Sequence, residues 1–188
     1  MNDNEDFNIA EEHFNNEEYE DAFRLYKSLA ERGSVESQVF LGWMYQNGLG
    51  VRKDSNTAYS WYEKAAKLGS AEGQFYLAKS CARKKDYEGA KDWYLKSADK
   101  GYAPALFRLG WIYDIGRGVK EDKEKALYYY TRAVNLGHVF AQKYLAVLMI
   151  KGHLGFIARF NGVFQFIRSL FRGVIIASSD QHDDRIRE

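Results

Sequence analysis

A chain of 188 residues suits one or two domains, and its 46% apolar and 28% charged residues exclude a largely disordered protein. The formal net charge of +1 is unevenly distributed, because residues 1–36 carry eleven acids and three bases (−8) and residues 37–188 carry the balance (+9). The single cysteine, Cys81, excludes an intramolecular disulfide framework and fits a reducing compartment.

The beginning of the chain, MNDNEDFNIAEEHF, has neither the basic segment nor the apolar segment of a secretory signal. No run of about 18 uncharged apolar residues follows, which argues against a membrane-spanning helix. We therefore expect a cytoplasmic protein. Its acidic start and basic remainder predict either ordinary solvated helix faces or two surfaces that select partners by charge.

Three columns of residues recur along the chain at alternating spacings of 36 and 32 residues. The first pairs a large aliphatic residue with glycine or alanine, the second pairs a bulky residue with tyrosine, and the third is glycine. They begin at Ile9, Leu41, Leu77, Leu109 and Leu145; at Leu25, Trp61, Trp93 and Tyr129; and at Gly33, Gly69, Gly101 and Gly137. Repeats of this length are typical of solenoids, in which each unit stacks on its neighbours.

Each unit is predicted to contain two helices, because apolar residues recur at steps of three and four around both Leu41 and Trp61. Small residues in these columns let helix backbones approach closely, while tryptophan and tyrosine fill the grooves beside them. Cys81 shares a column with Tyr45 and Tyr113, so we predict that it is a buried core thiol.

The predicted helices also have recognisable ends. The third-column glycines suit the left-handed residue that follows a helix, and Asp54, Asp86 and Asp122 suit the N-cap of the second helix in their units. Pro104 fits the first turn of a helix. The 36-residue units insert glycine-rich loops at 47–51 and 115–119, where the 32-residue units have tight turns at 15–18 and 83–86.

The segment LGWMYQNGLGVRKDSNTAYSWYEKAAKLG closely resembles the Sel-one-like repeat (SLR), a branch of the tetratricopeptide-like α-solenoids. Residues 37–72 and 105–140 carry nearly all of the family pattern. Residues 5–36 and 73–104 lack its Gly-X-Gly-Val loop, and residues 141–152 resemble half a further unit. The resemblance implies an all-α, right-handed superhelix of helix-turn-helix repeats over residues 5–152, and a non-enzymatic adaptor that holds other proteins.

First helices typically line the concave side of such a stack, so variable positions there are candidate contacts for a partner protein or peptide. The candidates are Phe40, Trp43, Tyr76, Lys79, Arg83, Arg108, Trp111 and Tyr144. We expect Phe40, Lys79 and Arg108 to be exposed. For Trp43 and Trp111, packing between neighbouring hairpins is an equal alternative to partner binding.

Residues 153–178 are predicted to form an amphipathic helix before a flexible tail at 179–188. Its arginines make a spanning role costly. We expect it to cap the solenoid, to lie on an anionic membrane at its inner face, or to dock on a protein. The membrane-interface candidates are Phe156, Arg159, Phe160, Phe164, Arg168, Phe171 and Arg172.

No catalytic, cofactor-binding or metal-binding constellation is recognisable in the sequence. The histidines lack partners at metal-ligand spacings, and His138 is expected at the surface near a turn. No nucleophile elbow, Walker loop or dinucleotide fingerprint is present. We therefore predict no enzyme, no cofactor and no small-molecule substrate. The short cluster Arg83-Lys84-Lys85 is a weak indication of nucleic-acid binding, which ranks behind protein binding.

Overall fold

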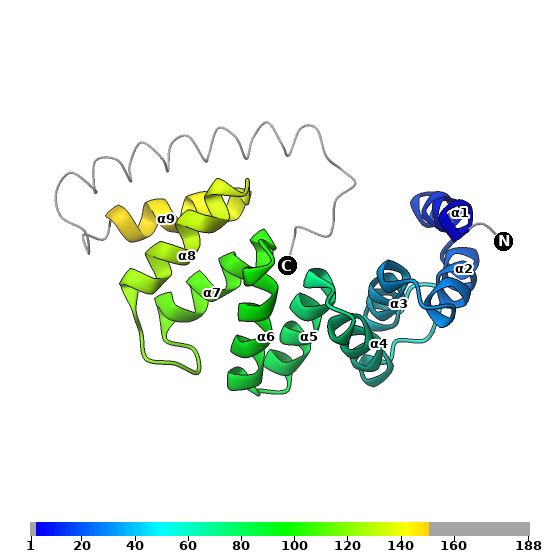
Figure 1. Ribbon diagram of the computed structural model, residues 1–188, viewed down its shortest axis with the longest axis horizontal. Helices are drawn as coiled ribbons and strands as arrows, with labels where there is room; N and C mark the ends of the chain where they lie inside the picture. The colour runs from blue at the N-terminus through cyan, green and yellow to red at the C-terminus, as the bar shows by residue number, and fades with distance from the viewer. Residues whose placement is uncertain (1–2, 151–188) are drawn as a thin grey trace. The chain divides into compact units, whose positions relative to one another are not determined.

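The computed structural model describes residues 3–150, and these residues form α-helices joined by turns, without any strand. The helices are α1 (Asp3–Asn15), α2 (Tyr19–Glu31), α3 (Val35–Asn47), α4 (Ser55–Lys67), α5 (Ala71–Arg83), α6 (Tyr87–Asp99), α7 (Ala103–Ile115), α8 (Lys123–Asn135) and α9 (Val139–Ile150) (Figure 1). The predicted all-α repeat fold is confirmed. The helix predicted within residues 153–178, and the tail after it, lie outside the described residues.

The chain divides into two compact units. Unit 1 is Met1–Tyr102 and contains three hairpins, α1–α2, α3–α4 and α5–α6. Unit 2 is Ala103–Glu188, and its described part contains the hairpin α7–α8 and the helix α9. Consecutive helices within each unit pack on one another. Such packing between sequence neighbours defines a repeat protein.

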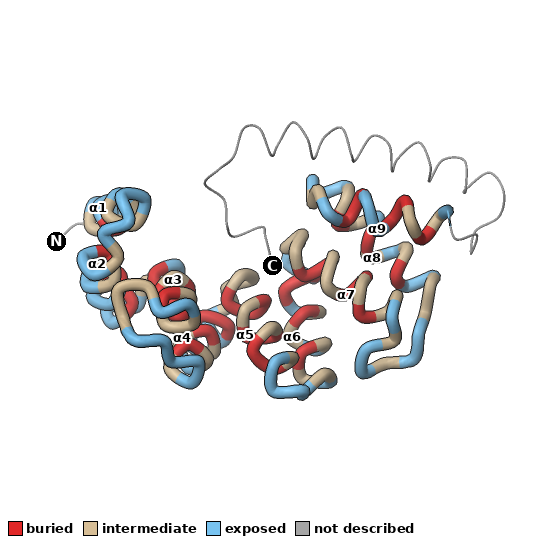
Figure 2. The backbone as a smooth tube through the Cα atoms, turned by 180° about the vertical axis from the view of Figure 1, so that it is seen from behind, coloured by how far each residue is buried: buried red, intermediate tan, exposed pale blue. Residues whose placement is uncertain are grey.

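Small residues in the predicted columns bring the two helices of a hairpin together. Ala58 is fully buried, and a Cβ atom added at Gly42 would lie only 2.7 Å from Cε1 of Tyr62. In unit 2, a Cβ atom added at Gly110 would lie 2.5 Å from Cδ1 of Tyr130. Only glycine leaves room for these rings. Figure 2 shows buried positions along the helix sides that face other helices.

The predicted helix ends are confirmed. Asp54, Asp86 and Asp122 each accept hydrogen bonds from backbone N–H groups in the first turn of the helix that follows them. The four third-column glycines all have positive φ. In the two tight turns, however, the left-handed position is held by Glu17 (φ 63°) and Lys85 (φ 65°), which the sequence did not predict.

The two long loops are closed by different side-chain pairs at equivalent positions. In unit 1, Nε2 of Gln46 donates to Oγ of Ser55 at 3.2 Å. In unit 2, Nζ of Lys123 lies 2.8 Å from Oδ1 of Asp114. Each pair joins the end of a first helix to the start of a second helix, so the loop between them has fixed ends.

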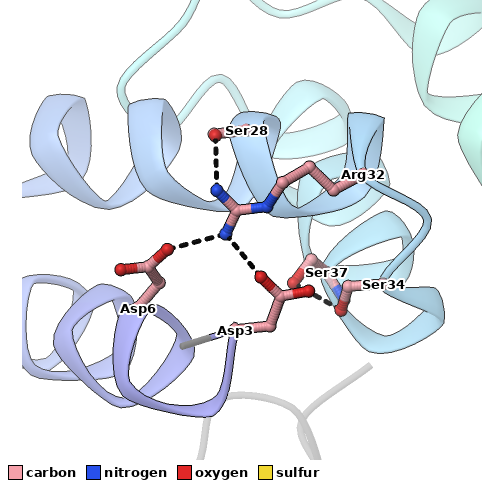
Figure 3. A network of polar contacts seen from close by, with 6 residues as sticks. All are labelled: Asp3, Asp6, Ser28, Arg32, Ser34 and Ser37. Carbon is pink, nitrogen blue, oxygen red and sulfur yellow. Dashed lines mark hydrogen bonds and ion pairs between the residues drawn. The ribbon is translucent and has the colours of Figure 1, made fainter. Parts of the chain in front are cut away.

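Arg32, directly after α2, ties the acidic helix α1 to its hairpin partner (Figure 3). Its Nη2 atom lies 2.6 Å from Oδ2 of Asp6 and 2.9 Å from Oδ1 of Asp3, and Nη1 donates to Oγ of Ser28 at 3.4 Å. The hydrogen bond to Asp6, together with the charges of both carboxylates, raises the pKa of Arg32 above its ordinary value. Partly exposed ion pairs contribute little to stability, but this pair of contacts orients α1.

The glycine-rich loop between α3 and α4 packs on the preceding hairpin. Gly50 has φ 63°, and a Cβ atom added there would overlap the carbonyl oxygen of Tyr19. Leu49 packs on the same group of buried residues as Phe14 and Tyr19. The loop is therefore a contact between hairpins, which explains why the α3–α4 hairpin needs glycine at position 50.

We expect Gly50→Ala to lower the free energy of unfolding by about 2 kcal/mol more than Gly101→Ala. Both substitutions place a side chain at positive φ, but only the first forces a Cβ atom into a neighbouring backbone. Gly101 (φ 77°) has no atom within 4 Å of an added Cβ atom. Urea unfolding followed by circular dichroism measures both losses. Equal losses would show that the loop does not press on Tyr19.

Candidate functional site

One column of the candidate partner-binding residues forms ring contacts between successive hairpins. In each contact, a tyrosine of a second helix meets an aromatic residue of the next first helix. The pairs, with the distance between ring centroids, are Tyr26–Phe40 (4.9 Å), Tyr62–Tyr76 (5.1 Å) and Tyr130–Tyr144 (5.8 Å). This column therefore serves packing, whatever else it does.

The expectation that Phe40, Lys79 and Arg108 are exposed is wrong, since all three are half-buried. Phe40 also meets the ring of Phe7 edge-on, at 5.8 Å between centroids. The Lys79 ammonium lies 5.7 Å from the centre of the Tyr76 ring, within range of a cation–π attraction. The rings of Phe7 and Tyr26 come from other helices and cover Phe40, which would be open on an isolated helix.

The two tryptophans are half-buried as well. Trp43 meets Phe14 of α1 edge-on at 5.5 Å, so it packs between neighbouring hairpins, as one of the two alternatives proposed. The Arg117 guanidinium lies 5.3 Å from the centre of the Trp111 ring in unit 2. Arg83, in contrast, is exposed at the end of α5.

The eight candidates fall into two groups, one in each unit. Helices α3 and α5, which contact each other, carry the unit 1 group, and helices α7 and α9 carry the unit 2 group. The unit 1 group is Phe40, Trp43, Tyr76, Lys79 and Arg83, and the unit 2 group is Arg108, Trp111 and Tyr144.

Helix α9, which is the first helix of the fifth repeat, carries two exposed aromatic side chains. Phe140 is 41% exposed and Tyr144 is 36% exposed. Phe140 was missed by sequence reasoning because the equivalent positions in unit 1, Glu36 and Glu72, are acids. The sequence did carry a signal for Phe140, because a bulky apolar residue replaces the acids found at equivalent positions of other repeats.

His138, expected at the surface, is instead a half-buried cap of α9. Its Nδ1 atom accepts a hydrogen bond from the backbone N–H of Ala141 at 3.2 Å, and its ring stacks on Phe107 at 4.6 Å. Burial, with a smaller effect from the charge of Arg108, lowers the pKa of the imidazole to about 4. The neutral ring is therefore the form that caps the helix.

The remaining sequence predictions concern chemistry and membranes. Cys81 is 5% exposed, which confirms the buried thiol, and burial raises its pKa. Within residues 3–150, no three His, Cys, Asp or Glu side chains gather as metal ligands would. None of the helices in that range has the length and apolar character needed to cross a bilayer. The candidates Phe156, Arg159, Phe160, Phe164, Arg168, Phe171 and Arg172 lie outside the described residues.

Known proteins share this arrangement of helices. The Sel1 repeat family model matches residues 16–34, 35–70, 71–102 and 103–138. The crystal structure of a Sel1 repeat protein from Oxalobacter formigenes matches 92% of this chain and 74% of its own, with a TM-score of 0.81 and 27% identity.

Two relatives are similar in sequence. An uncharacterised protein of Neisseria meningitidis serogroup B is 33% identical over 128 residues, which is 67% of this chain. Chitin synthase regulatory factor 3 of Schizosaccharomyces pombe is 34% identical over 130 residues, or 65% of this chain. The matches span only 27% and 14% of these relatives' own lengths, so the likeness concerns the repeats and not the whole relatives.

We expect Phe40→Ala to lower the free energy of unfolding by about 2 kcal/mol, because it removes a half-buried ring that stacks on Tyr26. Phe40→Tyr keeps the ring, as Tyr76 does at the equivalent position, and should change stability by less than about 0.5 kcal/mol. Thermal and urea unfolding measure both. An unchanged stability for Phe40→Ala would mean that the ring is free to serve a partner alone.

Because of His138, the free energy of unfolding should decrease as the pH is lowered. Because its pKa is about 4 in the folded chain and 6.5 ordinarily, the unfolded chain binds more protons between these values. The contribution of His138 is therefore complete above about pH 6.5, declines as pH falls to about 4, and then levels off.

His138→Ser provides the matched control, because Ser34 and Ser70 cap α3 and α5 from the equivalent position. The variant should keep the cap and lose the decline between pH 6.5 and 4, measured by urea unfolding across that range. The same decline in both proteins would assign the pH dependence to other groups.

Proposed function

The chain belongs to the Sel1 repeat family, and on that premise we propose that it is a non-enzymatic scaffold that holds a partner protein against its first-helix faces. Sel1 repeat proteins are typically protein-interaction scaffolds. The proposal gives this chain no catalytic step. Peripheral attachment to a membrane through residues 153–178 is the alternative, and it rests on the sequence alone.

The observation that carries the proposal is the open aromatic surface of α9. Phe140 and Tyr144 keep 41% and 36% of their area exposed, although an aromatic ring gains most when it is covered. His138 lies 6.2 Å from the Phe140 ring, and Arg108 is close enough to lower the pKa of His138. Aromatic rings bordered by arginine are the usual anchors of protein interfaces.

Unit 1 also carries aromatic and basic side chains on its first helices, α3 and α5. Trp43, Tyr76 and Lys79 are half-buried, so each presents a remaining edge, and Arg83 is exposed. The rings are held by their neighbours in fixed positions, and such preorganisation lowers the entropy lost when a partner binds. The name of the fission-yeast relative, a regulatory factor, suits a protein that acts by binding.

A photo-cross-linking pair tests the proposal. The full chain carries p-benzoylphenylalanine in place of either Tyr144 on α9 or Tyr128 on α8, and is irradiated in an extract of its source cells. Both positions are tyrosines of unit 2, and they are 36% and 55% exposed. We expect a discrete protein adduct at position 144, identified by mass spectrometry, and none at position 128.

Two outcomes of this experiment would contradict the proposal. Adducts of the same kind and amount at both positions would reflect exposure alone, since the control side chain is the more exposed of the two. No adduct at position 144 would remove the first-helix face of α9 as a binding surface.

A further inference from the structure

Five exposed cations gather where first helices of unit 1 turn into second helices. Arg52 and Lys53 lie in the loop between α3 and α4, and Arg83, Lys84 and Lys85 lie at the end of α5 and in the turn before α6. We call these five residues the basic edge. Sequence analysis identified only Arg83, Lys84 and Lys85, as a short basic cluster.

The two halves of the basic edge are neighbours in space. The Lys84 ammonium lies 4.1 Å from the centre of the Tyr59 ring, so the α5–α6 turn lies against the beginning of α4. Tyr59 is about 6 Å along the helix axis from Ser55, the first residue of α4. Lys53 stands only two residues before Ser55. Cations from two hairpins therefore share one edge of unit 1.

The cations of the basic edge are not neutralised by carboxylates. No ion pair within residues 3–150 includes any of the five, whereas Lys67 on the same unit pairs with Glu63 at 3.2 Å. Segments 47–55 and 83–88 hold these five cations and three acids. Two of the acids, Asp54 and Asp86, are occupied as N-caps by backbone N–H groups. An excess of uncompensated positive charge remains at the surface.

Acidic residues limit the basic edge on one side. Gly50 of the α3–α4 loop lies against Tyr19, and around Tyr19 the residues Glu17, Glu18 and Glu20 are exposed. A nucleic-acid duplex or a bilayer surface that continued across unit 1 would meet these carboxylates and be repelled. A short anion avoids them. Packed helices lie about 10 Å apart, so two hairpins offer a length that about six extended residues can span.

We propose that the basic edge binds a short acidic segment of a partner protein, rich in aspartate and glutamate. The inference rests on the proposed function, because it names the chemistry of one contact with the partner. Arg52 and Arg83 supply planar guanidinium groups that can hold carboxylates with two parallel hydrogen bonds, and the three lysines add positive charge. Such contacts speed association and weaken with salt.

The test uses the full chain and a fluorescein-labelled hexaglutamate peptide, with binding read by fluorescence anisotropy at low ionic strength. The edge variant carries Arg52→Gln, Lys53→Gln and Arg83→Gln. The matched control carries Lys64→Gln, Lys96→Gln and Lys100→Gln, which removes the same charge from other exposed positions of unit 1 that likewise form no ion pair within residues 3–150. Circular dichroism melting verifies that both variants are folded. A labelled single-stranded RNA of matched charge is titrated in parallel.

We expect hexaglutamate to bind the unmodified chain, the edge variant to bind it roughly tenfold more weakly, and the control to stay within about twofold. The RNA should bind more weakly than the peptide. The proposal is overturned if hexaglutamate does not bind, if both variants weaken equally, or if the RNA binds more tightly. The Tyr144 cross-link lies in unit 2 and is read separately, so failure of the basic edge can be told apart from failure of the α9 surface.

Discussion

Within each compact unit, a tyrosine of a second helix meets an aromatic ring of the next first helix, and the stacking of hairpins there depends on this contact, which is seen in Tyr26–Phe40, Tyr62–Tyr76 and Tyr130–Tyr144. Tyr62 shows how it is arranged, because it fills the space over Gly42 of its own hairpin while its ring stacks on Tyr76 of the next. Any side chain at Gly42 would displace the ring. A stacked aromatic pair contributes about 1 kcal/mol beyond the apolar area that it buries. The small residue of the first column and the tyrosine of the second helix therefore recur together because both belong to the same contact.

The features that could be predicted from the sequence are those that local chemistry decides. Helices follow from apolar residues at steps of three and four, and Asp54 caps α4 through atoms only two and three residues away. Exposure could not be predicted in the same way. Phe40 and His138 are covered by rings that come from other helices, and a single helix pattern contains no information about those rings. Which candidate residues a partner can reach therefore depends on packing between helices, whereas the helices and their caps depend on local sequence.

The repeat packing also limits where a partner can bind. Rings such as Phe40 are shared between stability and recognition, so their removal would affect both. Side chains that stand clear of the ring stacks are free of this conflict, and they are of two kinds. Phe140 gives an apolar contact on α9, and the exposed cations of the α3–α4 and α5–α6 turns give a charged one. A scaffold of this design can change its partners by surface substitution while the glycine and tyrosine columns keep the hairpins stacked.

If the ring pairs between hairpins hold the stack together, Tyr62 and Tyr76 must stabilise the chain as a pair, and a double-mutant cycle on these two residues measures that coupling. Tyr62→Leu, Tyr76→Leu and the double variant are unfolded in urea, and the free energies are compared. We expect that the two losses are not additive, with a coupling of about 1 kcal/mol. Losses that add within about 0.3 kcal/mol would show that each ring contributes only by its own burial and that the ring pair does not hold the hairpins together.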